Sequence, residues 1–390
     1  MQFCNLQRMY EAHAEEFNEA LIQSASAAEY IGGRHVLELE KKLADFVGRK
    51  HALACANGTD ALVLALRALE VGPGDYVACP AFSFFATAEA INRVGAIPVF
   101  IDVDSDSFIL SEDSLKEALH VLRKAGQMVK AAIVVDTFGQ LARAKALTAF
   151  SNIYGFPLIE NASQSFGARL GKKRACSFGD ISTTSFYPTK PLACFGDGGM
   201  VFCDNERYLK SMRSLALHGS GNQIFEHMSI GINSRLDDLQ AAVLAVKFKY
   251  FEEEFQKRQE LAQNYEGLLS QSYAYAEGLI KLPELIKRDD SYSAWDHFTL
   301  RFENSSLRDF VHRELKNYDV PTHICYPKTL EKMPVYEDES LAHCPVSLEN
   351  AHSLSQTILS LPFDPYMTNE ELALVVSSLD ESVKNYKNKR

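Results

Sequence analysis

From about residue 50 onward, short apolar runs alternate with longer amphipathic ones, and this alternation limits the possible folds more than any other feature of the chain. The run "HALACA" precedes "TDALVLALRAL", "YVAC" precedes "FFATAEAINRV", and "IPVFIDV" precedes "EDSLKEALHVLRKA". "AAIVVD" precedes "AKALTAFSNIYG", which is followed by "PLIE". Continuous apolar runs are typical of strands that are buried on both faces, and helices between such strands indicate a largely parallel sheet. We therefore predict an α/β domain that binds its ligand at the carboxyl ends of the strands.

The pattern changes beyond residue 180. "DISTTSFY" and "GGMVFCD" are strand-like, without a full helix between them, and a long helical segment follows from about residue 235. The remainder mixes strands such as "HFTLRF" with helices such as "SLRDFVHRELKN". We therefore predict a large domain over residues 1–255, which includes the N-terminal segment and the connecting helix, and a smaller α+β domain over residues 256–390.

The chain carries a formal net charge of −11, which argues against nucleic acid or an anionic membrane surface as its main partner. Its first residues, "MQFCNLQRMYEAHAEEF", contain acids and have no apolar core, and no later stretch holds about 18 uncharged apolar residues. We therefore expect neither a signal peptide nor a membrane span, and a cytoplasmic location. The eight cysteines include no C-x-x-C pair, so we expect free thiols rather than a zinc site or disulfides, and no metal.

The usual nucleotide-binding motifs do not occur in the sequence. "GARLGKK" (167–173) has one residue too few between its glycines for a phosphate loop, and Lys173 stands where Ser or Thr should bind magnesium. No G-x-G-x-x-G follows a strand. A dinucleotide-binding domain and a P-loop enzyme are both disfavoured.

"CANGTDAL" (55–62) lies where a strand ends and a helix begins. Gly58 would allow close approach of the backbone, and Thr59 offers an N–H and a hydroxyl to an anion at the helix N-terminus. The alternative is a plain helix cap, in which Asn57 or Thr59 serves only the backbone. The motif alone leaves both interpretations open.

"PLIENASQSFGA" (157–168) is an apolar strand that ends in polar residues, among them Glu160, Asn161 and Gln164. Polar groups at the end of a buried strand are either hydrogen-bonded structure or ligand contacts, because burying them without a partner costs a few kcal/mol. Both remain possible from these residues alone.

"SFYPTKPLACFGDGGM" (185–200) places Lys190 beside a glycine-rich segment. Most lysines are solvated. A desolvated lysine can instead become a nucleophile that forms a Schiff base. An anion-binding loop at residue 58, polar groups at residue 160 and a lysine preceded by Ser185 together suit pyridoxal phosphate.

The sequence resembles the DegT-type sugar aminotransferases, pyridoxal-phosphate enzymes of the aspartate-aminotransferase fold (fold type I) that transfer an amino group from glutamate, or sometimes glutamine, to keto-sugars. The resemblance covers nearly the whole chain. Segments that occur here in the family's order include "EYIGGRHVLELEKKLADFVG", "NGTDAL", "PAFSFFATAEAI", "IENASQSFGA", "SFYPTKPLACFGDGGM", "GINSRLDDLQAA" and "LSLPFDPYMT". The expected fold is thus a large α/β domain with a mostly parallel sheet and a smaller α+β C-terminal domain.

The resemblance also implies roles for individual residues. Lys190 would carry the cofactor and then move the proton between Cα and C4′. The family pattern places the other cofactor and substrate contacts at Gly58, Thr59, Asp60 and Ser185 for the phosphate, Phe84 stacked on the ring, Asn161 and Gln164 near its edge, and Arg235 and Tyr326 on the substrate side. Asn233 would reach the phosphate of the neighbouring subunit, which implies a homodimer with shared active sites. A local alternative for "INSRLDDLQAA" is a helix cap by Asn233 or Ser234.

Three positions depart from the family pattern. Asn161 replaces the usual aspartate, whose carboxylate keeps the pyridine nitrogen protonated. Cys325 in "CYP" replaces a substrate-side histidine, and Leu217 stands where many relatives have arginine. A catalytically impaired member that binds cofactor or sugar, with a regulatory or scaffolding role, is therefore an alternative to an active enzyme.

The wording "SQSFGA", "TSFYPTKPL" and "GDGG" is most similar to enzymes that aminate C3 of a UDP-linked 3-keto N-acetylhexuronate. The sequence thus predicts an aminotransferase of nucleotide-linked keto-sugars for surface polysaccharide or lipopolysaccharide biosynthesis, with an amino-acid donor. Enzymes of 4-keto nucleotide sugars are the nearest alternative. Lys190 weighs against the family's dehydratases, which have histidine there.

Overall fold

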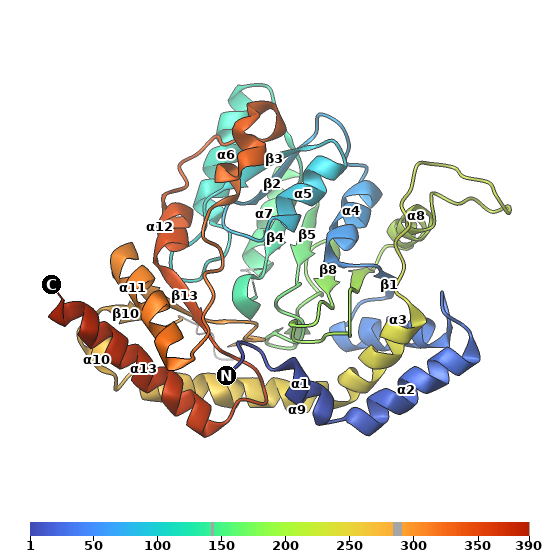
Figure 1. The fold of residues 1–390 in the computed structure, drawn as a ribbon. Helices are drawn as coiled ribbons and strands as arrows, with labels where there is room; N and C mark the ends of the chain where they lie inside the picture. Colours follow the sequence, from blue (N-terminus) through green and yellow to red (C-terminus); the bar gives the residue numbers. More distant parts are fainter. Residues whose placement is uncertain (142–143, 284–290, 390) are drawn as a thin grey trace.

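A computed structural model describes residues 1–141, 144–283 and 291–389, and its centre is a seven-stranded sheet (Figure 1). The strands of this sheet are β1 (His51–Cys55), β2 (Tyr76–Pro80), β3 (Ile97–Ile101), β4 (Val129–Val135), β5 (Leu158–Asn161), β8 (Ile181–Ser185) and β9 (Gly199–Cys203). Their order is β1-β9-β8-β5-β4-β2-β3. The pairs from β8 to β3 are parallel, whereas β9 runs antiparallel to both of its neighbours. The predicted α/β fold with a largely parallel sheet is confirmed.

Helices cover both faces of the sheet. The helices of this part are α2 (Ala14–Ala27), α3 (Arg34–Val47), α4 (Gly58–Ala68), α5 (Ala86–Arg93), α6 (Glu112–Lys124), α7 (Ala144–Tyr154), α8 (Glu206–Ala216) and α9 (Asp238–Leu269). Side chains of β9 alternate between two cores, because successive strand residues face opposite ways. Val201 packs with α4, α5 and α8, whereas Phe202 packs with α3 and α9. The strands are therefore buried on both faces, as their apolar runs predict.

The C-terminal part is built on a three-stranded antiparallel sheet, β10-β12-β13. Its elements are β10 (Ile280–Lys281), β12 (Phe298–Phe302), β13 (Ile358–Leu361), α10 (Tyr273–Ala276), α11 (Ser305–Leu315), α12 (Glu349–Thr357) and α13 (Asn369–Asn388). A small separate sheet pairs β11 (Ser291–Tyr292), β6 (Arg169–Leu170) and β7 (Lys173–Arg174). Short 3-10 helices are η1 (Thr137–Gly139), η2 (Lys316–Tyr318), η3 (Leu330–Lys332), η4 (Pro334–Glu337) and η5 (Glu339–Leu341).

Helix α9 joins the two cores along its length, without a break at residue 255. Leu244 and Phe251 pack into the core beneath the large sheet, whereas Leu261 and Tyr265 belong to the core of the C-terminal sheet. In Figure 1 the helix runs along the base of the molecule. The two parts are thus held together by one continuous helix.

The first residues lie against the C-terminal part, although they are far from it in sequence. Helix α1 (Leu6–Glu11) carries Arg8, which contacts Glu371 of α13 at 2.6 and 3.0 Å. The Phe363 N–H donates to the carbonyl of Phe3 at 3.0 Å. These bonds fix the N-terminal segment beside the sheet β10-β12-β13.

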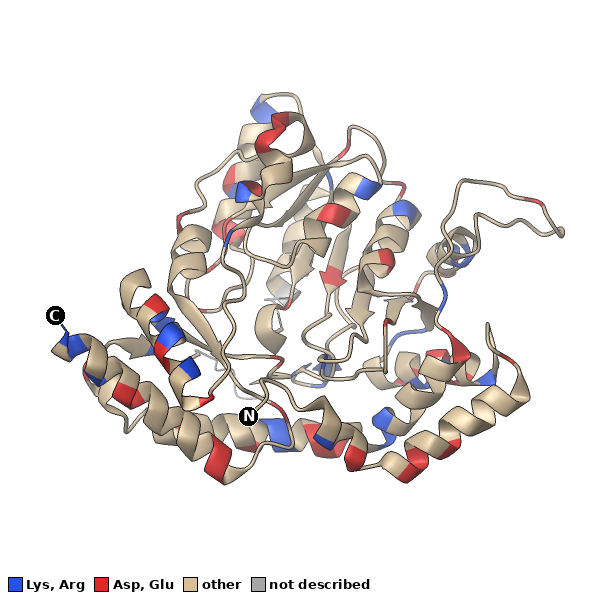
Figure 2. Cartoon of the chain, viewed as in Figure 1, with Lys and Arg blue, Asp and Glu red and all other residues tan. Residues whose placement is uncertain are grey.

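Acidic and basic residues are interspersed over the elements seen in Figure 2. None of the helices in the described ranges has the length and apolar character needed to span a bilayer. The eight cysteines are free thiols, and of these Cys344 is exposed.

Candidate active site

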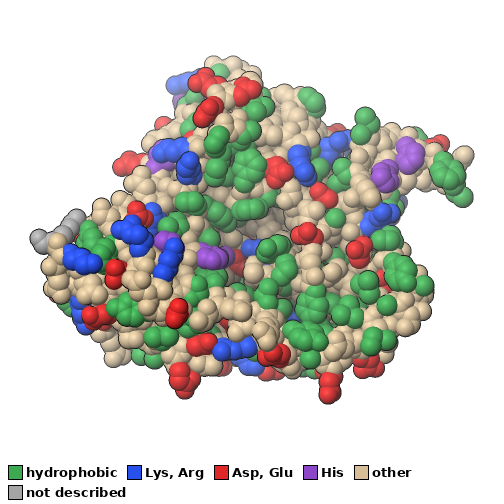
Figure 3. Space-filling model, in the orientation of Figure 1, with side chains coloured by type: hydrophobic (Ala, Val, Ile, Leu, Met, Phe, Trp, Pro, Cys, Tyr) green, Lys and Arg blue, Asp and Glu red, His purple; other side chains and the backbone are tan. Residues whose placement is uncertain are grey.

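A cavity of about 860 Å³ opens where the strands of the parallel sheet end. The surface is hollowed there, between the large sheet domain and the C-terminal part (Figure 3). The predicted site residues that line it are Gly58, Thr59, Phe84, Asn161, Gln164, Ser185, Lys190 and Tyr326. The structure therefore brings together residues from five separate stretches of the sequence.

The N-terminus of α4 forms one wall of this cavity. Asn57 is the N-cap, and its Oδ1 accepts a hydrogen bond from the Asp60 N–H at 2.8 Å. A Cβ added at Gly58 would lie 2.8 Å from the Ser185 Cβ. The helix-cap interpretation is confirmed for Asn57, and Gly58 and Thr59 line the cavity, where an anion would bind if the second interpretation is right. The close approach at Gly58 requires glycine and leaves a narrow polar cradle between α4 and Ser185.

The end of β5 contributes Asn161. Its Oδ1 accepts a hydrogen bond from the Ser163 N–H at 3.2 Å. Gln164 follows, accepting from the Phe138 N–H at 2.7 Å and donating to the Tyr326 hydroxyl at 3.0 Å. Burial raises the pKa of Tyr326, so the phenol stays protonated. These bonds fix the polar groups at the strand end and join them to the C-terminal part.

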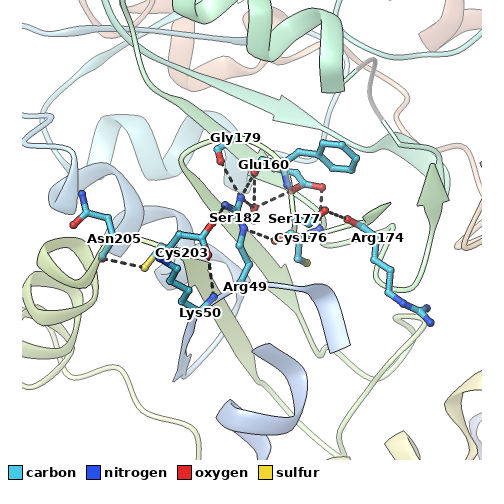
Figure 4. Close-up of polar contacts among 12 residues, drawn as sticks. Arg49, Lys50, Glu160, Arg174, Cys176, Ser177, Gly179, Ser182, Cys203 and Asn205 are labelled. Carbon is cyan, nitrogen blue, oxygen red and sulfur yellow. Dashed lines mark hydrogen bonds and ion pairs between the residues drawn. The ribbon is translucent and has the colours of Figure 1, made fainter. Parts of the chain in front are cut away.

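Glu160 precedes Asn161 and faces the opposite side of the sheet. Its carboxylate accepts hydrogen bonds at 2.8–2.9 Å from the Cys176 and Phe178 N–H groups and the Ser182 hydroxyl (Figure 4). Arg49 donates to the carbonyls of residues 176, 178 and 179 around this carboxylate. Burial raises the pKa of Glu160, although these donors and Arg49 oppose the shift. Glu160 is thus a structural residue that ties the loop before β8 to β5.

Lys190 contacts a buried acid within the cavity. Its Nζ lies 3.2 Å from Asp296 Oδ2, and His297 Nδ1 lies 2.8 Å from the same oxygen. Burial alone would raise the pKa of Asp296, but the charges of Lys190 and His297 hold it below its ordinary value. Burial disfavours the His297 imidazolium, yet the Asp296 carboxylate outweighs it and raises the pKa of His297 to about 9. Lys190, Asp296 and His297 therefore form a connected charge cluster.

Three predicted residues, all of them in the described ranges, lie outside this cavity. Asp60 points toward Arg93, with 3.5 Å between Oδ1 and Nη1, and its N–H is used by Asn57. Asn233 and Arg235 line a separate cavity of about 300 Å³. Asp197 borders both cavities.

The suggested helix cap by Asn233 or Ser234 is wrong. Helix α9 begins four residues later, with Asp237 as its N-cap. The Ser234 hydroxyl instead accepts a hydrogen bond from the Ala56 N–H at 3.1 Å, and Asn233 is exposed. Asn233 is therefore available to a second molecule.

Sequence reasoning missed several residues of the cavity wall. Asp296 and His297 enter from the start of β12, and Phe3 enters from the N-terminal segment, where its ring stacks on His323 with centroids 4.0 Å apart. The sequence signal for Asp296 is an acidic residue between Trp295 and a strand. This signal is weak unless its contact with Lys190 is known. Phe3 carries no local signal, since its position depends on contacts with residues more than 300 positions away.

The DegT/DnrJ/EryC1/StrS aminotransferase family matches the chain over residues 11–380. A UDP-2-acetamido-2-deoxy-3-oxo-D-glucuronate aminotransferase from Pseudomonas aeruginosa is 36% identical over 379 residues, which cover 97% of this chain and 99% of the relative. A dTDP-3-amino-3,6-dideoxy-alpha-D-galactopyranose transaminase from Aneurinibacillus thermoaerophilus is 31% identical over 378 residues, with 97% and 98% covered.

Solved structures show the same fold over the whole chain. A DegT DnrJ EryC1 StrS aminotransferase from Brucella abortus superposes with a TM-score of 0.91 and 37% identity, covering 97% of this chain and 98% of the other. The structure of ntda from Bacillus subtilis, with bound cofactor PMP, has a TM-score of 0.88 and 27% identity, covering 98% of this chain and 85% of the other.

Proposed function

The chain belongs to the DegT/DnrJ/EryC1/StrS family as a pyridoxal-phosphate-dependent sugar aminotransferase, and on that premise we propose that its acceptor is a UDP-linked 3-keto-N-acetylhexuronate. The amino group goes to C3, glutamate is the donor, and the product serves surface polysaccharide or lipopolysaccharide biosynthesis. The observation that carries the proposal is the match of nearly the whole chain to the P. aeruginosa enzyme of a UDP-linked 3-oxo-glucuronate. The acceptor of that relative is a sugar of the proposed class.

The residues of the cavity suit pyridoxal phosphate. The cradle between α4 and Ser185, which a Cβ at Gly58 would fill, offers N–H and hydroxyl donors to a phosphate at a helix N-terminus. Gly58, Thr59 and Ser185 would hold the phosphate, and Phe84 would cover the ring. Asp60 supports this turn, because its N–H donates to Asn57 Oδ1. Asn161 and Gln164 would lie at the ring edge, with Tyr326 on the substrate side, and Lys190 would be the residue that carries the cofactor.

Pyridoxal phosphate, when bound, supplies an electron sink that allows the Cα–H bond of the donor to break. Lys190 Nζ would be the base that takes this proton and moves it. Gln164 orients the Tyr326 hydroxyl, because its amide bridges that hydroxyl and the Phe138 N–H.

Lys190 as the cofactor lysine is tested by borohydride reduction. Reconstituted protein absorbs in the visible, and reduction leaves the label on the peptide that contains Lys190. A label on another lysine would overturn this assignment.

The proposed enzyme is a homodimer with shared active sites. Asn233 and Arg235 lie outside the cavity of their own chain, and Asn233 is exposed. The loop between α8 and α9 projects from the body (Figure 1) and carries four strongly exposed apolar side chains: Ile224, Phe225, Met228 and Ile230. Hydrophobic side chains at this arm stand out in Figure 3. Contiguous exposed apolar groups favour a protein contact, and a second copy of the chain would cover them.

The acceptor is tested by incubating the holoenzyme with glutamate and a panel of UDP- and dTDP-linked 3-keto and 4-keto sugars, followed by mass spectrometry. Amination of the UDP-linked 3-keto hexuronate above all others is expected. Preferential amination of a dTDP-linked sugar, the second candidate raised by the A. thermoaerophilus relative, would overturn the proposal, and so would preferential amination of a 4-keto sugar.

One observation favours a different second candidate, a member that binds its ligands and turns over poorly. Asn161 supplies an amide where the family pattern has a carboxylate, and an amide cannot provide the charge that stabilises a protonated pyridine nitrogen. Such a protein would bind pyridoxal phosphate and sugar without aminating any acceptor in the panel. Turnover separates the two candidates.

A further inference from the structure

Asp296 stands out among the cavity residues because it contacts the lysine directly. Its Oδ2 lies 3.2 Å from Lys190 Nζ and 2.8 Å from His297 Nδ1, and the Asp296 side chain is 1% exposed. A carboxylate removed from water to this degree persists only where cations or donors compensate it. Here Lys190 and His297 compensate it from two sides.

The other charged and titratable groups around this carboxylate come from several elements. Arg258 of α9 contributes a positive charge and donates to the carbonyl of Trp295 at 3.0 Å. Burial raises the pKa of the Cys4 thiol to about 11 and raises that of Tyr326, so both are neutral. Burial lowers the pKa of His323. Cys325 lies against His297, with 3.9 Å between Sγ and Nε2. Asp296 is therefore the negative charge of this cluster.

The position of Asp296 matters in both states of the lysine. When Lys190 carries no cofactor, its ammonium donates a hydrogen bond to the Asp296 carboxylate. This contact involves no covalent bond. If the same nitrogen carries the cofactor, a carboxylate at this position would stabilise its protonated form relative to its neutral form. His297 reduces this effect by sharing the same oxygen.

We propose that Asp296 is a positioning residue for Lys190, held in place by His297, and that the pair sets how firmly the cofactor-bearing nitrogen keeps its proton. This inference rests on the proposed role of Lys190 as cofactor lysine. It assigns opposite effects to Asp296 and His297: the carboxylate favours the protonated Lys190 nitrogen, and the imidazolium disfavours it.

The test is the pH at which the visible absorption band of the bound cofactor changes, measured on the holoenzyme without any substrate. Asp296→Asn removes the negative charge, so the proton is lost more readily and the midpoint moves to lower pH, by about one unit or more. His297→Gln removes the neighbouring imidazolium and leaves the carboxylate uncompensated. The midpoint of this variant moves to higher pH.

Asp106→Asn is the matched control, because Asp106 is half-exposed, pairs with Arg301 at 3.8 Å and does not line the cavity. Its midpoint equals that of the unaltered protein. The proposal is supported if the midpoint pH falls in Asp296→Asn and rises in His297→Gln. A nonspecific disturbance of the site would move the midpoints of both variants in the same direction. Unchanged midpoints, or shifts in one direction only, overturn it.

If Asp296→Asn fails to fold, His297→Gln alone decides the matter through the sign of its shift. The measurement uses neither glutamate nor a sugar. A wrong acceptor therefore leaves the absorbance result intact, and a failed absorbance result leaves the acceptor proposal intact.

Discussion

Asn161 is the residue at which the chemistry of the cofactor and the sequence of this chain disagree. Asn161→Asp introduces a carboxylate at the position proposed to face the pyridine nitrogen, and an aspartate Oδ1 can still accept from the Ser163 N–H. A charge partner shifts a pKa by about one to three units, each worth about 1.4 kcal/mol. We expect the half-reaction with glutamate to become about tenfold faster or more, as measured by stopped-flow absorbance.

Ser163→Ala is the control, since it removes a cavity hydroxyl without changing the charge at residue 161. An unchanged or slower half-reaction in Asn161→Asp would show that this amide does not limit the rate. An increase in cofactor affinity without any turnover would favour the impaired binder.

Gly58 tests the phosphate cradle. Gly58→Ala introduces a Cβ 2.8 Å from the Ser185 Cβ, so α4 or Ser185 must shift. We expect pyridoxal phosphate to bind about tenfold more weakly, which corresponds to about 1.4 kcal/mol. Equilibrium titration by absorbance measures the affinity.

Gly267→Ala provides the comparison, because Gly267 lies within α9 with nothing within 4 Å of the added Cβ. This variant should keep its cofactor affinity and gain about 0.4–1 kcal/mol of stability. Equal affinities for the two alanine variants would contradict the role assigned to the cradle.

Sequence patterns identified those site residues whose local context is distinctive. Gly58 follows a strand and precedes a helix, and Lys190 sits beside glycines, so their neighbours mark them. Asp296 has no such local context. It is recognised as a site residue only through its contact with Lys190, which is 106 positions away. A contact of that kind is decided by tertiary packing.

At the level of elements, the Glu160 network is the strongest candidate for a stability test. Glu160→Gln keeps one oxygen but turns an NH₂ group toward an N–H or O–H donor that the carboxylate now satisfies. We expect the free energy of unfolding to fall by about 1–3 kcal/mol. Urea unfolding followed by circular dichroism measures it.

Glu206→Gln removes an acid of the same type at an exposed position on α8, where it pairs with Lys210 at 2.8 Å. This change should cost less than about 0.5 kcal/mol. A similar loss of unfolding free energy in both variants would mean that the buried network around Glu160 contributes no more stability than an exposed ion pair.

The strands and helices of the sheet domain could be predicted because each apolar run is a buried strand and each amphipathic run covers it.

The start of α9 could not be predicted from the sequence. "GINSRLDD" offers Asn, Ser and Asp as caps, and the chain uses Asp237 because residues 232–234 pair with the turn after α8 instead. Cap residues compete, and tertiary hydrogen bonds decide among them.

In the whole molecule, the N-terminal segment, the long helix α9 and the C-terminal sheet meet around one cavity. Phe3 and Asp296 reach it from opposite ends of the sequence, and α9 fixes the two cores relative to each other. The domain boundary predicted at residue 255 falls within this helix. The cavity therefore depends on contacts that no single segment of the sequence specifies.

The proposed sharing of active sites between subunits leads to a prediction for mixed dimers. Asn233→Ala should weaken cofactor retention, and Lys190→Ala should abolish turnover. When the two variants exchange subunits, one site of each mixed dimer combines both defects, while the other pairs an intact Lys190 with the partner subunit's intact Asn233. The mixture should therefore be more active than either parent, as measured by product formation at limiting cofactor. If subunit exchange is confirmed by mass spectrometry of the intact dimers and activity does not return, Asn233 acts within its own chain, and the exposed arm between α8 and α9 must serve a different contact.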